Sequence, residues 1–117
     1  MNNDRFRFRA WMTEKEQYVY DVESTWDDIE ACFGDLINNP KYIIEQCTGL
    51  KDKNGNLIYE GDIIKGWRCD SYKIVWLNDI AQFFGVNMND NTDGYCLDDN
   101  IQFFEIVGNI HDQKEQQ

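Results

Sequence analysis

Short runs of β-branched and aromatic residues, separated by turn-forming residues, recur along most of this chain. Runs of this length and composition are typical of single strands, and Asn54-Gly55 is a strong hairpin signal between two of them. The runs that follow Pro40 lie at 42–47, 57–59, 63–67, 72–77, 82–86 and 102–107. A parallel sheet would need helices alternating with strands, and the sequence has no such alternation. The pattern therefore predicts antiparallel sheets.

The N-terminal part of the chain predicts a further hairpin. Arginines and apolar residues alternate over 5–10, and 18–22 has the composition of a second strand. A three-residue loop at 13–15 would place apolar residues opposite apolar residues and arginines opposite acids. The predicted pairs are Phe6 with Val22, Phe8 with Tyr20, Arg7 with Asp21 and Arg5 with Glu23. A four-residue loop would lose both sets of pairs, so we predict the shorter one.

One segment has helical spacing. Apolar residues recur at intervals of three and four from Trp26 to Ile37, after the capping hydroxyl of Thr25, and Pro40 disfavours a helix beyond them. The predicted fold class is therefore mainly β, a β-rich α+β fold. It is a small barrel or a pair of packed antiparallel sheets, of seven to eight short strands with one helix near residues 25–38. The length fits a single domain over residues 1–117.

The charge of the chain is strongly negative and uneven. There are 22 Asp and Glu against 11 Lys and Arg, a net charge of -11. Residues 16–40 and 74–113 each contain seven acids and no Lys or Arg, so the rest of the chain has a small positive balance. A chain of this charge has no general attraction for nucleic acid or anionic lipid. Because no apolar signal segment opens the sequence, we expect a cytoplasmic protein with no membrane partner.

Four cysteines stand at positions 32, 47, 69 and 96. No two of them have the two-residue spacing of a zinc knuckle or a redox motif. In a reducing cytosol we expect thiols, and Cys32 and Cys47 have the apolar neighbours of core positions. The sequence therefore predicts no structural metal.

The segment 89–100 partly fits a calcium-binding loop. The oxygen ligands at its positions 1, 3 and 5 would be Asn89, Asn91 and Asp93. Gly94 stands at the required turn, but Asn100 occupies the position that needs a glutamate, and no helices flank the segment. We interpret it as a solvated loop between strands and leave open whether it binds a cation.

Few residues offer catalytic chemistry. His111 is the single histidine, so any Cys-His or Ser-His nucleophile system would have to use it. Glu60 and Asp62 stand two residues apart, but Gly61 between them indicates an exposed bend rather than a catalytic carboxylate pair. The sequence contains no nucleophile elbow and no glycine-rich cofactor loop. We therefore expect a protein that is not an enzyme, with no catalytic residue and no cofactor.

Four segments, taken in order, resemble one protein family. They are FRFRAW at 6–11, QCTGLKDKNG at 46–55, IYEGDIIK at 58–65 and FEIVGNI at 104–110. Through them the chain resembles the YopX family of phage and prophage proteins. The resemblance implies a small, mainly β cytosolic protein of no established biochemical activity. The family commonly has an aromatic residue where Cys47 stands, and the resemblance carries no catalytic residue to this chain.

Three functions are compatible with these features. The preferred one is a non-enzymatic accessory protein that binds an unknown protein partner or itself, because four Trp and seven Phe exceed what one small core can bury. The second is an acidic DNA mimic, whose carboxylates in 16–40 and 74–113 form one surface that inhibits a DNA-binding host protein. The third is nucleic-acid binding through the strand that carries Arg5, Arg7 and Arg9, although such a stripe is usually solvated and salt-paired.

Overall fold

The computed structural model describes residues 4–22, 37–66, 70–89, 94–97 and 99–112. Its elements are η1 (Asp4–Phe6), β1 (Phe8–Met12), β2 (Gln17–Tyr20), β3 (Tyr42–Lys51), β4 (Leu57–Tyr59), β5 (Asp62–Lys65), β6 (Ser71–Leu77), β7 (Gln82–Asn87), β8 (Gly94–Cys96), η3 (Asp99–Phe103) and β9 (Glu105–Asn109). The mainly β prediction is confirmed. The helix predicted near residues 25–38 lies outside the described residues except at its last two positions. No helix of the described part is long and apolar enough to cross a membrane.

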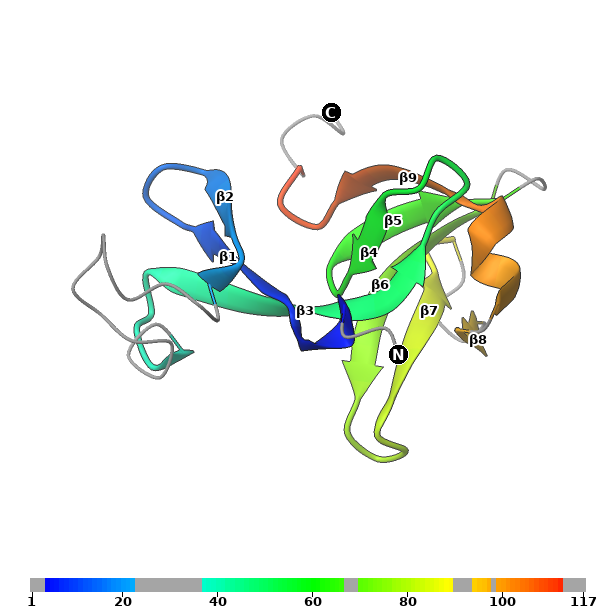
Figure 1. Cartoon of the computed structure of the whole chain (residues 1–117), viewed down its shortest axis with the longest axis horizontal. Helices are drawn as coiled ribbons and strands as arrows, with labels where there is room; N and C mark the ends of the chain where they lie inside the picture. The colour runs from blue at the N-terminus through cyan, green and yellow to red at the C-terminus, as the bar shows by residue number, and fades with distance from the viewer. Residues whose placement is uncertain (1–3, 23–36, 67–69, 90–93, 98, 113–117) are drawn as a thin grey trace.

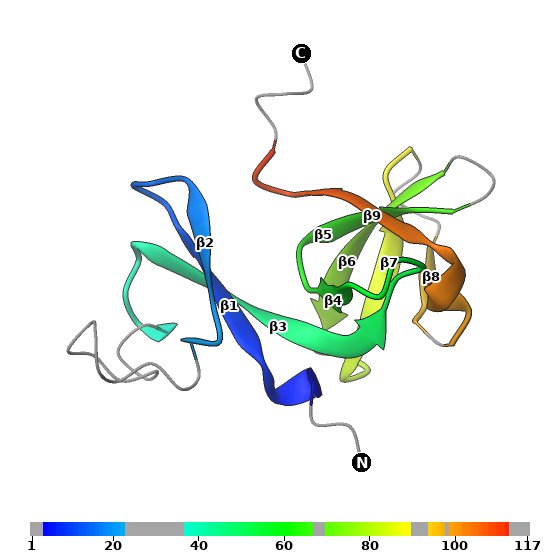
Figure 2. The ribbon, with the colours of Figure 1, turned by 45° about the horizontal axis from the view of Figure 1, so that its top comes forward.

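The strands form two antiparallel sheets. The four-stranded sheet has the order β2-β1-β3-β4, and the five-stranded sheet has the order β8-β7-β6-β5-β9. Figures 1 and 2 show two lobes bridged by the long strand β3, which runs from the β1-β2 hairpin to β4 in the other lobe. The prediction of antiparallel sheets built from short strands is therefore confirmed, and the part of the chain that the structure describes contains the strands β1 to β9.

Two of these strands differ from the sequence prediction. β8 lies inside the segment 89–100, which we interpreted as a loop, and it pairs with β7. The strand predicted over 102–107 begins later, at Glu105. The 3-10 helix η3 precedes it and places Ile101 in the core, at 1% exposure.

Each lobe has its own apolar core. Four side chains of the five-stranded lobe, which we call the isoleucine core, are almost fully buried: Ile58, Ile64, Ile74 and Ile101. They come from β4, β5, β6 and η3, so this core also fastens the end of the four-stranded sheet to the five-stranded one. In the hairpin lobe, the described residues include a second buried cluster of Ala10 and Val22, with Phe8, Val19, Tyr42 and Ile44 packed against it.

The turn between β3 and β4 confirms the hairpin predicted at Asn54-Gly55. Gly55 has a φ of +83°, which glycine adopts without strain. Asp52 is 4% exposed, and its Oδ1 accepts hydrogen bonds from the backbone N–H groups of Asn54 and Asn56, each at 2.9 Å. Its Oδ2 accepts the N–H of Ile106 in β9 at 3.1 Å. One carboxylate therefore shapes the turn and ties it to the other sheet.

The register of the first hairpin corrects the prediction. Met12 pairs with Gln17, which leaves a four-residue turn over 13–16 in place of the three-residue loop. Glu16 closes this turn with a φ of 53° and donates its N–H to Met12 O at 2.8 Å. The predicted arginine–acid pairs would have lain on an exposed face, where such pairs contribute little. In the observed register Tyr18 of β2 donates to the buried Glu45 at 2.9 Å and covers the guanidinium of Arg9, so contacts beyond the hairpin stabilise this register.

Candidate functional site

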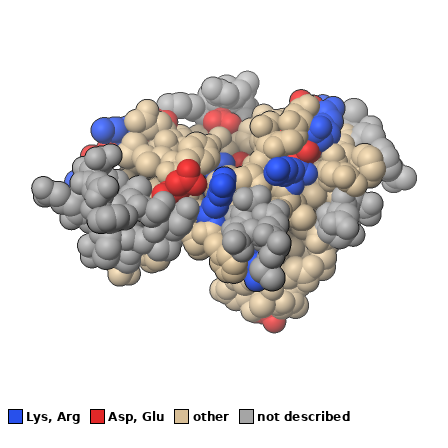
Figure 3. All heavy atoms as spheres, in the orientation of Figure 1, with Lys and Arg blue, Asp and Glu red and all other residues tan. Residues whose placement is uncertain are grey.

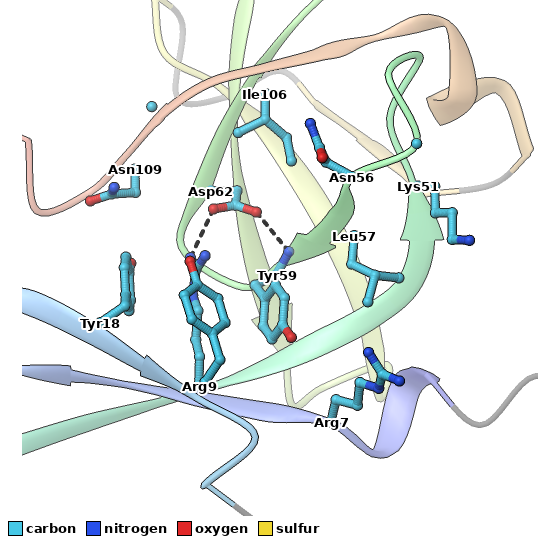
Figure 4. Close-up of a pocket in the computed structure, with 13 residues that line it drawn as sticks. Arg7, Arg9, Tyr18, Lys51, Asn56, Leu57, Tyr59, Asp62, Ile106 and Asn109 are labelled. Carbon is cyan, nitrogen blue, oxygen red and sulfur yellow. Dashed lines mark hydrogen bonds and ion pairs between the residues drawn. The ribbon is translucent and has the colours of Figure 1, made fainter.

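Arg9 is the centre of a buried polar cluster between the two sheets. Although it is a cation, it is only 4% exposed. Its Nε donates to Glu45 Oε1 of β3 and its Nη2 to Asp62 Oδ1 of β5, both at 2.8 Å, and Figure 4 shows it facing Asp62. Nη2 also donates to the backbone oxygen of Glu60 at 3.2 Å. Because β3 and β5 belong to different sheets, this one side chain joins them.

Two tyrosine rings enclose the guanidinium of Arg9. Its Cζ lies 4.0 Å from the centroid of the Tyr18 ring and 4.7 Å from that of Tyr59. A cation over an aromatic face is attracted by the ring quadrupole, most strongly where water is excluded. The rings therefore add to the stabilisation that the two carboxylates provide.

Glu45 has three side-chain partners. Its Oε1 accepts the Nε–H of Arg9 and, at 2.9 Å, the hydroxyl of Tyr18. Its Oε2 lies 2.9 Å from Nε2 of His111, which donates to the carboxylate. A Cβ on Gly61 would lie 2.7 Å from Glu45 Oε2, and Gly61 has a φ of +90°. The bend between β4 and β5 therefore requires glycine for its conformation and for its space.

His111 fastens the segment after β9 to the hairpin lobe. Its ring stacks on that of Trp11 in β1, with the centroids 4.3 Å apart and the planes 2° apart. Tyr18 meets the same imidazole edge-on at 5.8 Å. We refer to these joined side chains as the Arg9 cluster: Arg9, Trp11, Tyr18, Glu45, Tyr59, Asp62 and His111.

Burial and charge shift the titration of this cluster. Burial lowers the pKa of Arg9, but the attraction of Asp62 and Glu45 raises it by a larger amount. The net pKa is above its usual value, so the guanidinium stays charged. Burial raises the pKa of the Asp62 carboxyl, and Arg9 lowers it only in part. Burial also raises the pKa of Tyr59 to about 12 and that of Tyr18 above its usual range. Both phenols are therefore protonated at neutral pH.

A groove of about 720 Å³ lies over the Arg9 cluster, and we call it the inter-sheet groove. It is lined by Arg7, Arg9, Tyr18, Tyr20, Lys51, Gly55, Asn56, Leu57, Tyr59, Asp62, Ile106, Gly108 and Asn109. Figure 4 shows side chains from β1, β2, β4 and β9 around it, and Figure 3 shows the molecule hollowed between its lobes. Strands of both sheets therefore build one concave site.

A second hollow, of about 380 Å³, shares no lining residue with the groove. We call it the apolar hollow, because most of its lining is apolar: Ile43, Ile44, Glu45, Glu60, Gly61, Ile63, Lys73, Ile74, Val75, Met88 and Ile110. Burial raises the pKa of the Glu60 carboxyl beside it. The cation that lines this hollow, Lys73, is partly buried, whereas Arg7 and Lys51 of the groove are exposed.

The structure corrects the prediction of a solvated arginine stripe. Arg5 lies in the 3-10 helix η1, and Arg7 is exposed at the edge of the groove. Arg9 shares the face of Arg7 but is buried in its two ion pairs. Since Nε and Nη2 of Arg9 serve carboxylates of the same chain, a phosphate could replace them at these nitrogens only by breaking both ion pairs. The three arginines do not form one nucleic-acid contact surface.

The bend at residues 60–62 also differs from the prediction of an exposed turn. Asp62 is 3% exposed and accepts the N–H of Tyr59 at 2.7 Å in addition to Arg9. The side chain of Glu60 is partly buried, and its Oε1 accepts a hydrogen bond from the backbone N–H of Gln46 at 3.4 Å. The two carboxylates therefore have separate partners and do not form a pair.

Of the cysteines, the structure describes Cys47 and Cys96, and neither forms a disulfide within the described residues. Cys47 is fully buried, which confirms its core position, whereas Cys96 is exposed. No group of three or more His, Cys, Asp or Glu side chains in the described part of the chain could hold a metal ion. Because 90–93 and 98 lie outside that part, cation binding by the segment 89–100 stays an open question.

The DNA-mimic hypothesis depends on the acids of 16–40 and 74–113. Most of them fall outside the described residues or have no described side chain. Those with described side chains are Glu16, Asp21, Asp79, Glu105 and Asp112. Whether the acids of both stretches form one surface therefore stays a prediction.

Sequence reasoning missed Glu45, Tyr18 and Trp11 as site residues. Glu45 did offer a signal, since it is the one charge in the apolar run 42–47 and shares a strand face with buried Cys47. A charge in such a position requires a partner. Nothing local identifies that partner, because Arg9 stands 36 residues away.

The fold and the site define a two-sheet antiparallel β protein with a groove over a buried ionic cluster. The sequence profile of the YopX family, described as YopX protein, matches residues 7–116, and the chain belongs to this family. It is also similar to the crystal structure of protein EF1440 from Enterococcus faecalis, at 25% identity and a TM-score of 0.64, over 94% of this chain and 96% of that one. The comparison with curated proteins gave no match.

Proposed function

We propose that this chain is a non-enzymatic accessory protein of a phage or prophage, and that it binds its partner through the inter-sheet groove. Membership of the YopX family supports the phage part of the proposal. The observation that carries the binding part is a concave site whose floor is fixed by buried ion pairs and whose rim is exposed. A fixed site loses little conformational entropy when it binds.

The state of the polar groups favours binding over catalysis. A general acid or base has to reach the proton that it transfers. Glu45 is 2% exposed and its oxygens serve Arg9, Tyr18 and His111. The ring of His111 lies against Trp11, so the single histidine is engaged on its face and at Nε2.

The rim of the groove offers side chains of the kind that binding sites use. Tyr20 is 52% exposed, and Arg7 and Lys51 are also exposed. Tyrosine and arginine are enriched in protein interfaces because each combines a large contact area with hydrogen-bonding capacity. Because these side chains are exposed, we expect the fold to tolerate their substitution.

Quantitative affinity purification from an infected or lysogenic host tests the proposal. Tagged wild-type protein is compared with Tyr20→Ser in the groove and Ile43→Ser in the apolar hollow; Ile43 is 41% exposed. We expect one enriched partner that Tyr20→Ser loses and Ile43→Ser retains. Retention by both variants, or enrichment of nothing above the tag alone, would contradict the proposal.

Self-association is the second candidate, because large apolar side chains are exposed on the described residues. Those above one-third exposure are Phe6, Tyr20, Ile37, Ile43, Trp76, Ile80, Met88, Phe103 and Val107. Contiguous exposed apolar surface marks interaction sites. Light scattering coupled to size exclusion would show a dimer or larger assembly at micromolar concentration, and a strict monomer would eliminate this candidate.

A further inference from the structure

Two exposed cations, Arg7 and Lys51, line the inter-sheet groove. In its floor, Asp62 and Glu45 balance the charge of Arg9. The chain as a whole has a net charge of -11. In a concave site the local potential follows the charges that line it, so this groove attracts anions. Figure 3 shows Lys and Arg side chains on the same face, beside the hollow between the lobes.

The cations that a ligand can meet are at the rim. Arg9 is held by Glu45 and Asp62, so it supplies rigidity to the floor. Figure 4 shows Arg7 and Lys51 at one end of the groove, with Leu57 between them. An anionic group placed there would meet two exposed cations and one apolar contact.

The neutral lining is suited to a polypeptide backbone. The carboxamide of Asn56 combines donors and an acceptor, as a backbone does, whereas Asn109 offers its amide N–H groups, because its Oδ1 accepts the N–H of His111 at 2.8 Å. Gly55 and Gly108 bring main-chain groups to the surface without a covering side chain. Side-chain carboxylates on a bound segment would then alternate with backbone contacts along the groove.

The shape of the groove favours a segment of polymer over a small molecule. A small ligand gains affinity when most of its surface is buried, which an enclosed pocket achieves. This site is open between two lobes (Figure 3), so a ligand gains contact by extending along it. The overall charge disfavours a nucleic acid, because a long polyanion would meet repulsion as soon as it left the groove. At physiological salt, charges more than ~8 Å apart are largely screened from one another. A few carboxylates of a ligand inside the groove would therefore be attracted to the nearby cations more than they are repelled by the distant acids of the chain.

We infer that the inter-sheet groove binds an extended acidic peptide segment of a partner protein. The inference rests on the proposed function and names the chemistry of its ligand. Arg7 and Lys51 bind the carboxylates, the asparagines bind the backbone, and the exposed ring of Tyr20 covers the segment.

Fluorescence anisotropy with degenerate peptide pools tests this inference. Three labelled pools of equal length, with Asp/Glu, Lys/Arg or Ser/Gln at alternate positions, are titrated with the full chain. We expect the acidic pool to bind most tightly and to weaken as salt rises. Lys51→Glu should weaken it about tenfold, and Arg7→Glu similarly. Lys15→Glu makes the same change of charge in the exposed β1-β2 turn and should alter affinity less than about twofold.

Several outcomes would overturn the inference. Binding of the acidic pool no tighter than the basic pool does so, as does equal weakening by Lys51→Glu and Lys15→Glu. A single-stranded DNA oligonucleotide that competes at the same site more strongly than the acidic pool would assign the groove to nucleic acid instead. If the pools fail while host capture still depends on Tyr20, only the ligand class is wrong. If both fail, the proposed function is wrong as well.

Discussion

The molecule has two buried clusters of opposite character. The isoleucine core gains its stability from apolar area removed from water, which any well-fitting side chains of the same volume could supply. The Arg9 cluster instead depends on matched partners, because each buried charge is tolerated only while the others neutralise it. The first holds one lobe together, and the second joins the lobes and shapes the floor of the groove. The isoleucine core should therefore tolerate substitutions that keep its volume, whereas the Arg9 cluster should not tolerate the loss of one of its charges.

The largest expected effect on stability comes from removing the cation of the Arg9 cluster. Arg9→Leu leaves Glu45 and Asp62 buried without a counter-charge, and we expect the free energy of unfolding to fall by about 3–5 kcal/mol. Urea denaturation measures it. Arg7→Leu, just before the same strand, is the control, and loss of its exposed side chain should cost less than about 1 kcal/mol. Similar losses for both variants would contradict a buried ionic centre.

The isoleucine core is tested by changing the volume and the shape of one side chain separately. Ile64→Ala should cost about 2–5 kcal/mol, since it removes a fully buried side chain. Ile64→Leu keeps the volume and should cost less than about 1.5 kcal/mol. Val107→Ala, at a position 51% exposed, serves as the surface control in the same urea titration. If the leucine variant lost as much as the alanine variant, packing would be as specific here as in the Arg9 cluster.

Two glycines with nearly equal φ separate backbone strain from packing at the Arg9 cluster. Gly55 has a φ of +83° with nothing within 4 Å of an added Cβ, whereas Gly61 has a φ of +90° with Glu45 Oε2 at 2.7 Å. Gly55→Ala should therefore cost only left-handed strain, about 1–2 kcal/mol. Gly61→Ala should cost about 1–3 kcal/mol more, because the buried carboxylate must move. If thermal or urea unfolding showed the same loss of stability for both variants, the Glu45 carboxylate would be able to move aside without a free-energy penalty.

Alkaline titration gives the smallest of these effects. The pKa of Tyr59 is raised to about 12 in the fold, against about 10 in the unfolded chain, so the fold favours the neutral phenol. That contribution is fully present below pH about 10 and is lost as the pH rises through about 12. Tyr59→Phe should lose less stability than the wild type over this interval. Tyrosinate absorbance and urea unfolding, measured together, check it, and identical pH profiles would contradict the assignment.

Local signals in the sequence were sufficient for much of the fold. The Asn54-Gly55 turn, the bend at Gly61 and most strand positions follow from residues close together in the chain. The Arg9 cluster could not be predicted in this way. Glu45 and Asp62 stand 36 and 53 residues from Arg9, and only the packing of both sheets brings them together.

The prediction of the hairpin register was wrong for the same reason, because residues distant in the sequence determine it. Judged alone, the hairpin favours pairs between its own arginines and acids, and that reasoning selected the three-residue loop. In the folded chain Tyr18 of β2 donates to Glu45 and covers Arg9, and a shift of β2 by one residue would turn Tyr18 to the other face. Tertiary contacts around a buried charge therefore outweighed exposed local pairs.

The central claim is that a fixed, ion-paired floor supports an acidic-peptide site in the inter-sheet groove. The most direct measurement is an amide chemical-shift map of the isotope-labelled full chain during titration with the Asp/Glu peptide pool. The account predicts shifts at Arg7, Tyr20, Lys51 and Asn56, and none in the apolar hollow at Val75 and Met88. Shifts confined to the apolar hollow, or no shifts at a concentration that saturates binding, would contradict it.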